Sequence, residues 1–189
     1  GYACHATTVD IYQINGDWPG FAQAELEKAY PGTTFLFVAG AGADANPMPR
    51  RAVELAATYG KVMAAAVGQA LKAKPRPVSG PLKTAFATVD LPFQTPPSRA
   101  EWEARLSDKS VYEQRRARMM IGMLDRDGKL PSRYPYPLQV WRFGNSLTFI
   151  VMGGEVVVDY ALRFKSVYGW DNTWVAGYSN DVFGYVPTE

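Results

Sequence analysis

Three short loops rich in glycine and alanine hold many of the side chains that could do chemistry. Their small residues let the backbone approach a ligand closely, and α/β proteins bind ligands beyond the carboxyl ends of their strands. In the simpler alternative, the Asp and Asn side chains of these loops only cap helices. The loops and their polar residues are 40–46 with Asp44 and Asn46, 153–155 with Glu155, and 177–184 with Asn180 and Asp181.

The chain has one histidine, His5, and one cysteine, Cys4. A lone histidine is more often a hydrogen-bonded structural residue than a metal ligand, and it cannot form a zinc site by itself. A single cysteine excludes an intramolecular disulfide and a multi-thiolate zinc site. The sequence also lacks a His-Glu-x-x-His motif, an acidic calcium loop and a Gly-x-Ser-x-Gly elbow. It therefore contains no self-contained metal or nucleophile motif.

The composition is that of an ordinary folded domain, with 189 residues of which 47% are hydrophobic and 20% charged. Lys and Arg number 20 against 18 Asp and Glu, a net charge of +2, so no large basic field indicates a nucleic-acid partner. The one basic run, residues 109–118, spreads its arginines around a helix and is expected to be a solvated face. No apolar run of about 18 residues predicts a transmembrane segment.

Strands and helices alternate along the chain, which predicts an α/β fold with a mixed β-sheet and helices packed on it. No repeat or linker marks a boundary, so residues 1–189 are expected to form one domain. Asp17 is a candidate helix N-cap, Ser98 and Glu101 form a capping box, and Gly144-Asn145 predicts a hairpin turn. We expect strands at 2–9, 33–38, 82–93, 138–143, 147–152 and 173–176. Helices are expected at 18–29, 51–72, 110–125 and 155–168, and a further helical stretch is expected to begin at residue 98.

Taken in order, these segments resemble the neutral/alkaline (non-lysosomal) ceramidase family, especially its ceramidase-like bacterial branch. The five segments reach both ends of the chain, whereas the middle, about 55–140, carries no recognisable motif. The first segment is residues 3–8 (ACHATT), where the family has a zinc-binding histidine. The second is 14–22 (INGDWPGFA), similar to SGDNxGYA, and the third is 42–47 (GADANP), similar to GDxSPN. The last two are 153–155 (GGE), similar to PGE, and 177–188 (GYSNDVFGYVPT), similar to GLxNxYxxYxTT.

The resemblance implies that His5, Glu155 and Tyr185 are zinc ligands, and that Asp44 and Asn46 orient the substrate. Nitrogen and oxygen donors suit Zn²⁺, and a catalytic site leaves one position for a water. The metal would lower the pKa of that water and polarise the scissile carbonyl of an amide. The family site has one more histidine, upstream of the first residue here. The chain is therefore expected to be a fragment, incomplete at both ends, of a larger metallohydrolase domain.

Two positions depart from the family pattern. Asn46 stands where the family has a serine beside the proline, and Val182 replaces the first tyrosine of the last segment. Asparagine cannot act as a nucleophile and is bulkier than serine. We therefore expect the substrate to be a small-molecule amide or lipid-like amide other than ceramide, and the parent protein to be secreted, periplasmic or membrane-associated, as the resemblance implies.

The leading interpretation is a zinc-dependent hydrolase of an amide bond. Two alternatives remain open at this point. The first is a ceramidase-like domain that binds a ligand or partner without catalysis, because fold does not imply function. The second is an α/β scaffold whose glycine loops do no chemistry.

Overall fold

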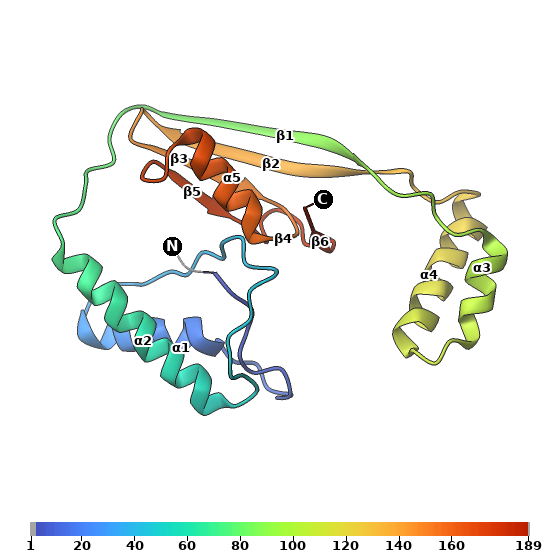
Figure 1. Cartoon of the computed structure of the whole chain (residues 1–189), viewed down its shortest axis with the longest axis horizontal. Helices are drawn as coiled ribbons and strands as arrows, with labels where there is room; N and C mark the ends of the chain where they lie inside the picture. The colour runs from blue at the N-terminus through green and yellow to red at the C-terminus, as the bar shows by residue number, and fades with distance from the viewer. Residues whose placement is uncertain (1–2, 189) are drawn as a thin grey trace. The chain divides into compact units, whose positions relative to one another are not determined.

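The computed structural model describes residues 3–188, which divide into two compact units (Figure 1). The first unit comprises Gly1–Ala87 and Pro137–Glu189, and the second Thr88–Tyr136. The predicted fold class is confirmed, because the chain forms a mixed sheet of four strands together with helices. The two points at which the chain passes from one unit to the other lie inside strands. The amino-acid composition therefore gives no sign of them.

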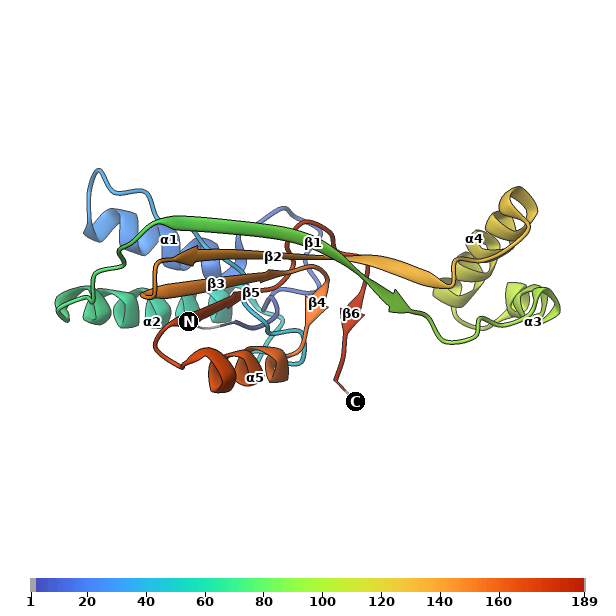
Figure 2. The same ribbon diagram turned by 90° about the horizontal axis from the view of Figure 1, so that it is seen from above.

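The main sheet has the strand order β1-β2-β3-β5, and the predicted hairpin forms its centre (Figure 2). β2 and β3 pair antiparallel, with Phe143 opposite Leu147 on either side of the Gly144 turn, where φ is +52°. β3 and β5 pair parallel, with Val151 beside Ala176. The strands are β1 (Leu82–Pro92), β2 (Arg133–Phe143), β3 (Leu147–Met152) and β5 (Thr173–Ala176).

Two very short strands form a second sheet at the start of helix α5 (Val158–Tyr168). They are β4 (Glu155–Val156) and β6 (Tyr185–Val186), which pair parallel. The helix expected over residues 155–168 therefore begins three residues later, because its first residues pair with β6 instead. α5 then packs against β5.

Helices α1 (Asp17–Ala29) and α2 (Val53–Lys72) pack against each other. The helices were expected to pack on the sheet, whereas α2 packs on α1. At Gly60 of α2 a Cβ atom would lie 2.5 Å from the Cβ of Phe21 and 2.9 Å from the carbonyl oxygen of Trp18. The absence of a side chain at Gly60 therefore sets how closely the two helices approach. Within residues 3–188, no helix is both long and apolar enough to cross a membrane.

Two expected strands are absent from the described residues. Residues 33–38 have no regular structure, and Leu36 is 85% exposed, so the prediction of a buried strand was wrong. An apolar run becomes a buried strand only where other segments pair with it and cover it. Here the backbone of Phe35 bonds instead to the side chains of Gln23 and Glu27 in α1. Residues 3–9 are likewise irregular and are held by hydrogen bonds to the side chain of Asp17 and to the backbone of Ala45 and Arg51, while Tyr2 lies outside the described residues.

The second unit contains a helical hairpin whose caps follow the sequence signals. Ser98 and Glu101 form the predicted capping box, and Gly128 ends the second helix in the left-handed conformation. Trp102 is 2% exposed and lies beneath the guanidinium groups of Arg105 and Arg116, 4.8 and 5.5 Å from its ring centroid. Part of the basic run thus covers an aromatic ring. The helices are α3 (Arg99–Ala104), the 3₁₀ turn η1 (Arg105–Ser107) and α4 (Val111–Asp127).

Gly60→Ala should lower the free energy of unfolding by about 1–3 kcal/mol, because the new methyl group meets the backbone of α1 and overpacks the contact. The matched control is Gly68→Ala in the same helix, where the nearest atom to a new Cβ is the Tyr30 hydroxyl at 3.7 Å. That substitution should raise stability by about 0.5–1 kcal/mol, since glycine is unfavourable inside a helix. Urea denaturation measures both, and equal stability of the two variants would contradict the close helix contact.

Candidate functional site

Three side chains from opposite ends of the chain meet in the first unit. The Nε2 atom of His5 lies 3.3 Å from Oε2 of Glu155 and 3.4 Å from the hydroxyl oxygen of Tyr185. The rings of His5 and Tyr185 are stacked, with their centroids 6.4 Å apart. The structure therefore brings together the three residues that the sequence resemblance nominated as metal ligands.

The β4–β6 ladder places Glu155 and Tyr185 next to each other. They are direct partners in the parallel register, so their side chains leave the same face of this small sheet. The amide of Glu155 donates to the carbonyl of Gly184 (2.8 Å). Gly154 has a φ of +69°, and a Cβ atom there would stand 2.9 Å from the Gly184 carbonyl oxygen. Glycine at 154 is thus required for the chain to enter β4 beside β6.

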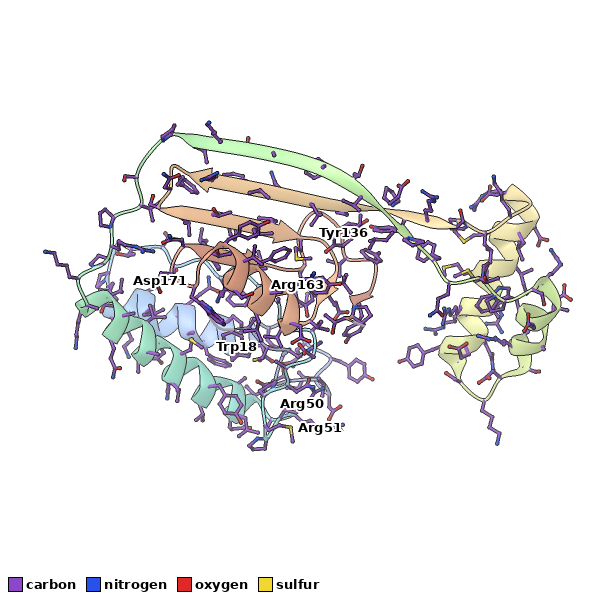
Figure 3. The ribbon with its side chains drawn as sticks, turned by 45° about the horizontal axis from the view of Figure 1, so that its top comes forward. Trp18, Arg50, Arg51, Tyr136, Arg163 and Asp171 are labelled. Carbon is purple, nitrogen blue, oxygen red and sulfur yellow. The ribbon has the colours of Figure 1, made fainter. Side chains whose placement is uncertain are left out.

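Backbone and indole hydrogen bonds fix the ring of His5. Its amide and its Nδ1 atom both reach the carbonyl oxygen of Ala45, at 2.9 and 3.1 Å. The indole Nε1 of Trp18, labelled in Figure 3, donates to the His5 carbonyl (3.2 Å). A carbonyl oxygen only accepts hydrogen bonds, so the hydrogen-bond network assigns a proton to Nδ1. Nε2 is the ring atom that faces Glu155 and Tyr185.

Asp17 anchors the irregular segment that carries His5. Its carboxylate accepts from the amides of Thr7 (2.8 Å) and Thr8 (2.7 Å), from the Thr8 hydroxyl (2.6 Å) and from the amide of Trp18 (2.7 Å). Burial works to raise the pKa of Asp17, which is 7% exposed, but the hydrogen bonds from Thr8, Thr7 and Trp18 outweigh it and lower that pKa. Asp17 was expected only to cap a helix. Instead it begins α1 and ties residues 7–8 to it.

The two separations from Nε2 of His5 suit neighbouring ligands of one zinc ion. Zn²⁺ takes imidazole nitrogen and carboxylate oxygen, and two donors of one tetrahedral ion stand about 3.3–3.4 Å apart when each is about 2.0–2.1 Å from the metal. The separations from Nε2 match this spacing, whereas a good N–H···O hydrogen bond is about 2.9–3.0 Å long. Among the described residues, no three His, Cys, Asp or Glu side chains form a metal-binding group, and the role of Tyr185 as a third ligand stays a prediction.

Tyr178 is a fourth polar side chain at this place, and the sequence analysis did not single it out. Burial, the negative charge of Glu155 and a hydrogen bond to that carboxylate raise the pKa of Tyr178 to about 12. A hydrogen bond to Glu155 likewise raises the pKa of Tyr185. The charge of Glu155 therefore acts on both tyrosines as well as lying beside the imidazole of His5. No local sequence pattern marks Tyr178, because its position depends on the turn after β5.

Asp44 and Asn46 form their side-chain hydrogen bonds elsewhere than with His5, Glu155 and Tyr185. Oδ1 of Asp44 accepts from the amide of Val158 at 2.9 Å, the capping role of the simpler alternative. Oδ1 of Asn46 accepts from the side chain of Arg50, labelled in Figure 3. Their predicted contact with substrate stays a prediction. In the third loop, the carbonyl of Asp181 accepts from the amide of Gly154 (2.7 Å) and so supports β4.

Two cavities border the segment that carries His5. One of about 200 Å³ is bordered by His5, Tyr178 and Phe37, and one of about 310 Å³ is bordered by Asn46 and apolar side chains that include Trp18. Cys4 borders both. The first cavity therefore gives His5 and Tyr178 access to a ligand, while Asn46 belongs to the second.

Comparison with known protein families found no family model that matches the chain, and no curated protein matches it either. The resemblance to the ceramidases therefore stays a prediction from the ordered sequence segments.

Asp17→Asn should lower the free energy of unfolding by about 1–3 kcal/mol, because buried donors lose a charged acceptor. The folded-state pKa of Asp17 lies below its ordinary value of 3.8, so its stabilisation is complete above pH 3.8 and is lost as the pH falls through the folded-state pKa. In urea denaturation across this pH range, the free energy of unfolding of the variant should fall less steeply toward acid pH than that of the natural protein.

The matched control for this experiment is Asp10→Asn, since Asp10 is an exposed carboxylate paired with Arg51 at 3.3 Å. It should change stability by less than about 0.5 kcal/mol. An Asp17→Asn protein as stable as this control would show that the carboxylate does not hold residues 7–8.

Proposed function

We propose that this chain carries most of the metal site of a zinc-dependent amide hydrolase resembling neutral ceramidase, with His5, Glu155 and Tyr185 as three of its ligands. The observation that carries the proposal is the pair of 3.3 and 3.4 Å separations between Nε2 and the two oxygens, which suit donors sharing one tetrahedral ion. The order of the five ceramidase-like segments along the sequence supports it independently.

The protein's own groups hold and orient the site in this proposal. Ala45 keeps the proton on Nδ1 of His5, so the other ring nitrogen is free to bind a cation. Such an outer hydrogen bond also raises the basicity of a ligating histidine. Bound zinc would supply Lewis-acid chemistry, acidifying a water and polarising the scissile carbonyl. Tyr185 is 57% exposed, which leaves this side of the site open, and the 200 Å³ cavity beside His5 receives an apolar part of the substrate.

A second candidate function is binding of a ligand without hydrolysis. The hydrogen bonds of Asp44 to the start of α5 and of Asn46 to Arg50 favour this function. Side chains that already have these structural roles are not needed to orient a substrate for hydrolysis. Assays of amide hydrolysis by zinc-loaded protein separate the two functions. Zinc binding without turnover of any N-acyl substrate would favour the second.

Glu155→Gln should weaken zinc binding by more than about a hundredfold, because even outer-shell partners of a metal ligand are worth about ten- to a hundredfold. Competition with a chromophoric chelator gives the affinity. If Glu155 were only a carboxylate near a helix N-terminus, its substitution would instead cost about 0.3–1 kcal/mol of stability and leave zinc binding unchanged.

The control for this measurement is Asp159→Asn, which removes an acidic group from the first turn of the same helix. Its zinc affinity should equal that of the natural protein. If Glu155→Gln bound zinc as tightly as the natural protein, Glu155 would not be a zinc ligand, and this would contradict the proposed function.

Asn46→Ser should raise ceramide turnover by about tenfold over a slow natural rate, because a serine offers a small hydroxyl where asparagine offers a larger carboxamide already bonded to Arg50. Release of fatty acid from ceramide is measured with both proteins at equal zinc content. Arg50→Ala is the control, since it frees the carboxamide but adds no hydroxyl, and it should leave ceramide turnover low. Rapid turnover by the natural protein would show that residue 46 does not determine the substrate.

A further inference from the structure

The 310 Å³ cavity has no part in the proposed function. It is bordered by the loop at residues 46–48 and by side chains of α1 and α2. Its volume lies at the lower end of the range for small-molecule sites, about 300–1,000 Å³. Trp18 is 3% exposed and borders its buried part, whereas Met48 and Val62 are 79% and 65% exposed. The cavity is therefore open to solvent on the side of Met48 and Val62, where a ligand can enter.

The walls of this cavity are mainly apolar. From α2, Tyr59, Val62 and Met63 border it, and their spacing of three and four residues places them on one face of the helix. The hydroxyl of Tyr59 donates to the carbonyl of Pro49 (2.6 Å), which leaves its ring for contact with a ligand. Methionine side chains adapt to the shape of an apolar partner. Such walls suit a flexible hydrocarbon chain.

Hydrogen-bond donors and a positive charge lie at one edge of the cavity. Asn46 borders it, and Oδ1 of Asn46 accepts from the guanidinium of Arg50, which Figure 3 labels. Within residues 3–188, Nδ2 of Asn46 and the other guanidinium N–H groups of Arg50 have no acceptor. The next residue, Arg51, pairs with Asp10 at 3.3 Å, whereas Arg50 has no carboxylate partner in the described part of the chain. A guanidinium beside an amide donor is suited to bind a carboxylate.

Backbone hydrogen bonds hold the loop that carries these donors at both of its ends. The amide of His5 donates to the carbonyl of Ala45 (2.9 Å), and the amide of Arg51 donates to the carbonyl of Thr7 (2.7 Å). A loop that is fixed before the ligand arrives loses little conformational freedom on binding, and this favours affinity.

We propose that this cavity is a binding site for an alkyl carboxylate, a fatty acid of medium chain length. The hydrocarbon chain lies against Trp18 and the α2 side chains, and the carboxylate accepts hydrogen bonds from Arg50 and Asn46. The apolar walls account for binding of the chain, and the positive charge favours an acid over a neutral alcohol of the same length. The inference goes beyond the proposed function and does not require zinc, because none of these side chains belongs to the candidate metal site.

The experiment is calorimetric titration of the chain with decanoate, below its critical micelle concentration, and with decan-1-ol. A chelator is present throughout, so the result does not depend on zinc. Decanoate should bind about ten- to a hundredfold more tightly than decan-1-ol, because hydrogen bonds to a charged group are the stronger ones. Arg50→Gln should remove this difference by weakening the binding of decanoate alone. The matched control is Arg51→Gln, since Arg51 is the neighbouring arginine with its own carboxylate partner, and it should leave both affinities unchanged.

A second pair of variants tests the position of the hydrocarbon chain. Val62→Glu places a carboxylate at the open side of the cavity and should weaken decanoate binding by more than about tenfold, because the new charge meets the apolar chain and repels the acid. Leu71→Glu is the control, since Leu71 is another exposed apolar residue of α2, at 54% exposure, outside the cavity lining. Absence of decanoate binding by the natural chain overturns the proposal, as does binding of equal strength in Val62→Glu or in Arg50→Gln. Each of these results leaves the proposed zinc site standing, because zinc binding is measured separately.

Discussion

The candidate site depends on the carboxylate of Asp17. The segment that carries His5 has no helix or strand of its own, so its position comes from the hydrogen bonds that Asp17 accepts from residues 7 and 8 and from the bonds between His5 and Ala45. A buried carboxylate is stable in a protein only when its oxygens are satisfied, and here four donors satisfy them. The same arrangement fixes the residue that follows, Trp18, whose indole bonds to the backbone of His5. One ionised group thus connects the start of α1 to the imidazole.

The other half of the site is built with few residues. Two strands of two residues each place Glu155 beside Tyr185, and the positive φ at Gly154 lets the chain enter that pairing. His5 presents a ring nitrogen to this pair while its other nitrogen is bonded to Ala45. That ring nitrogen faces the carboxylate of Glu155 at 3.3 Å and the hydroxyl of Tyr185 at 3.4 Å. The backbone thus brings one nitrogen and two oxygens from opposite ends of the sequence to one place.

Local signals in the sequence predicted the parts of the fold that depend on neighbouring residues. The turn at Gly144-Asn145 and the capping box at Ser98 are of this kind. The sequence could not predict that residues 33–38 lie uncovered, or that α2 packs on α1, because both depend on which distant segments come to cover them. The three residues that converge were nominated by family resemblance and not by local pattern, since their meeting depends on the long-range β4–β6 register. Asp17 and Tyr178 were not nominated for the site, because an N-cap signal does not reveal a bond to residues 7–8, and a left-handed tyrosine has no sequence signature.

The small size of the β4–β6 sheet has a consequence for local dynamics. A two-residue ladder has few cooperative hydrogen bonds, and such elements open far more often than the central strands of a sheet. Each opening separates Glu155 from Tyr185 and exposes the amides of Glu155 and Val157, which are otherwise bonded to Gly184 and Val186. A ligand that bridges the two side chains binds only the closed form and therefore reduces the population of the open one by mass action. Amide hydrogen exchange at these two residues thus reports on the occupancy of the site, although neither amide contacts the ligand.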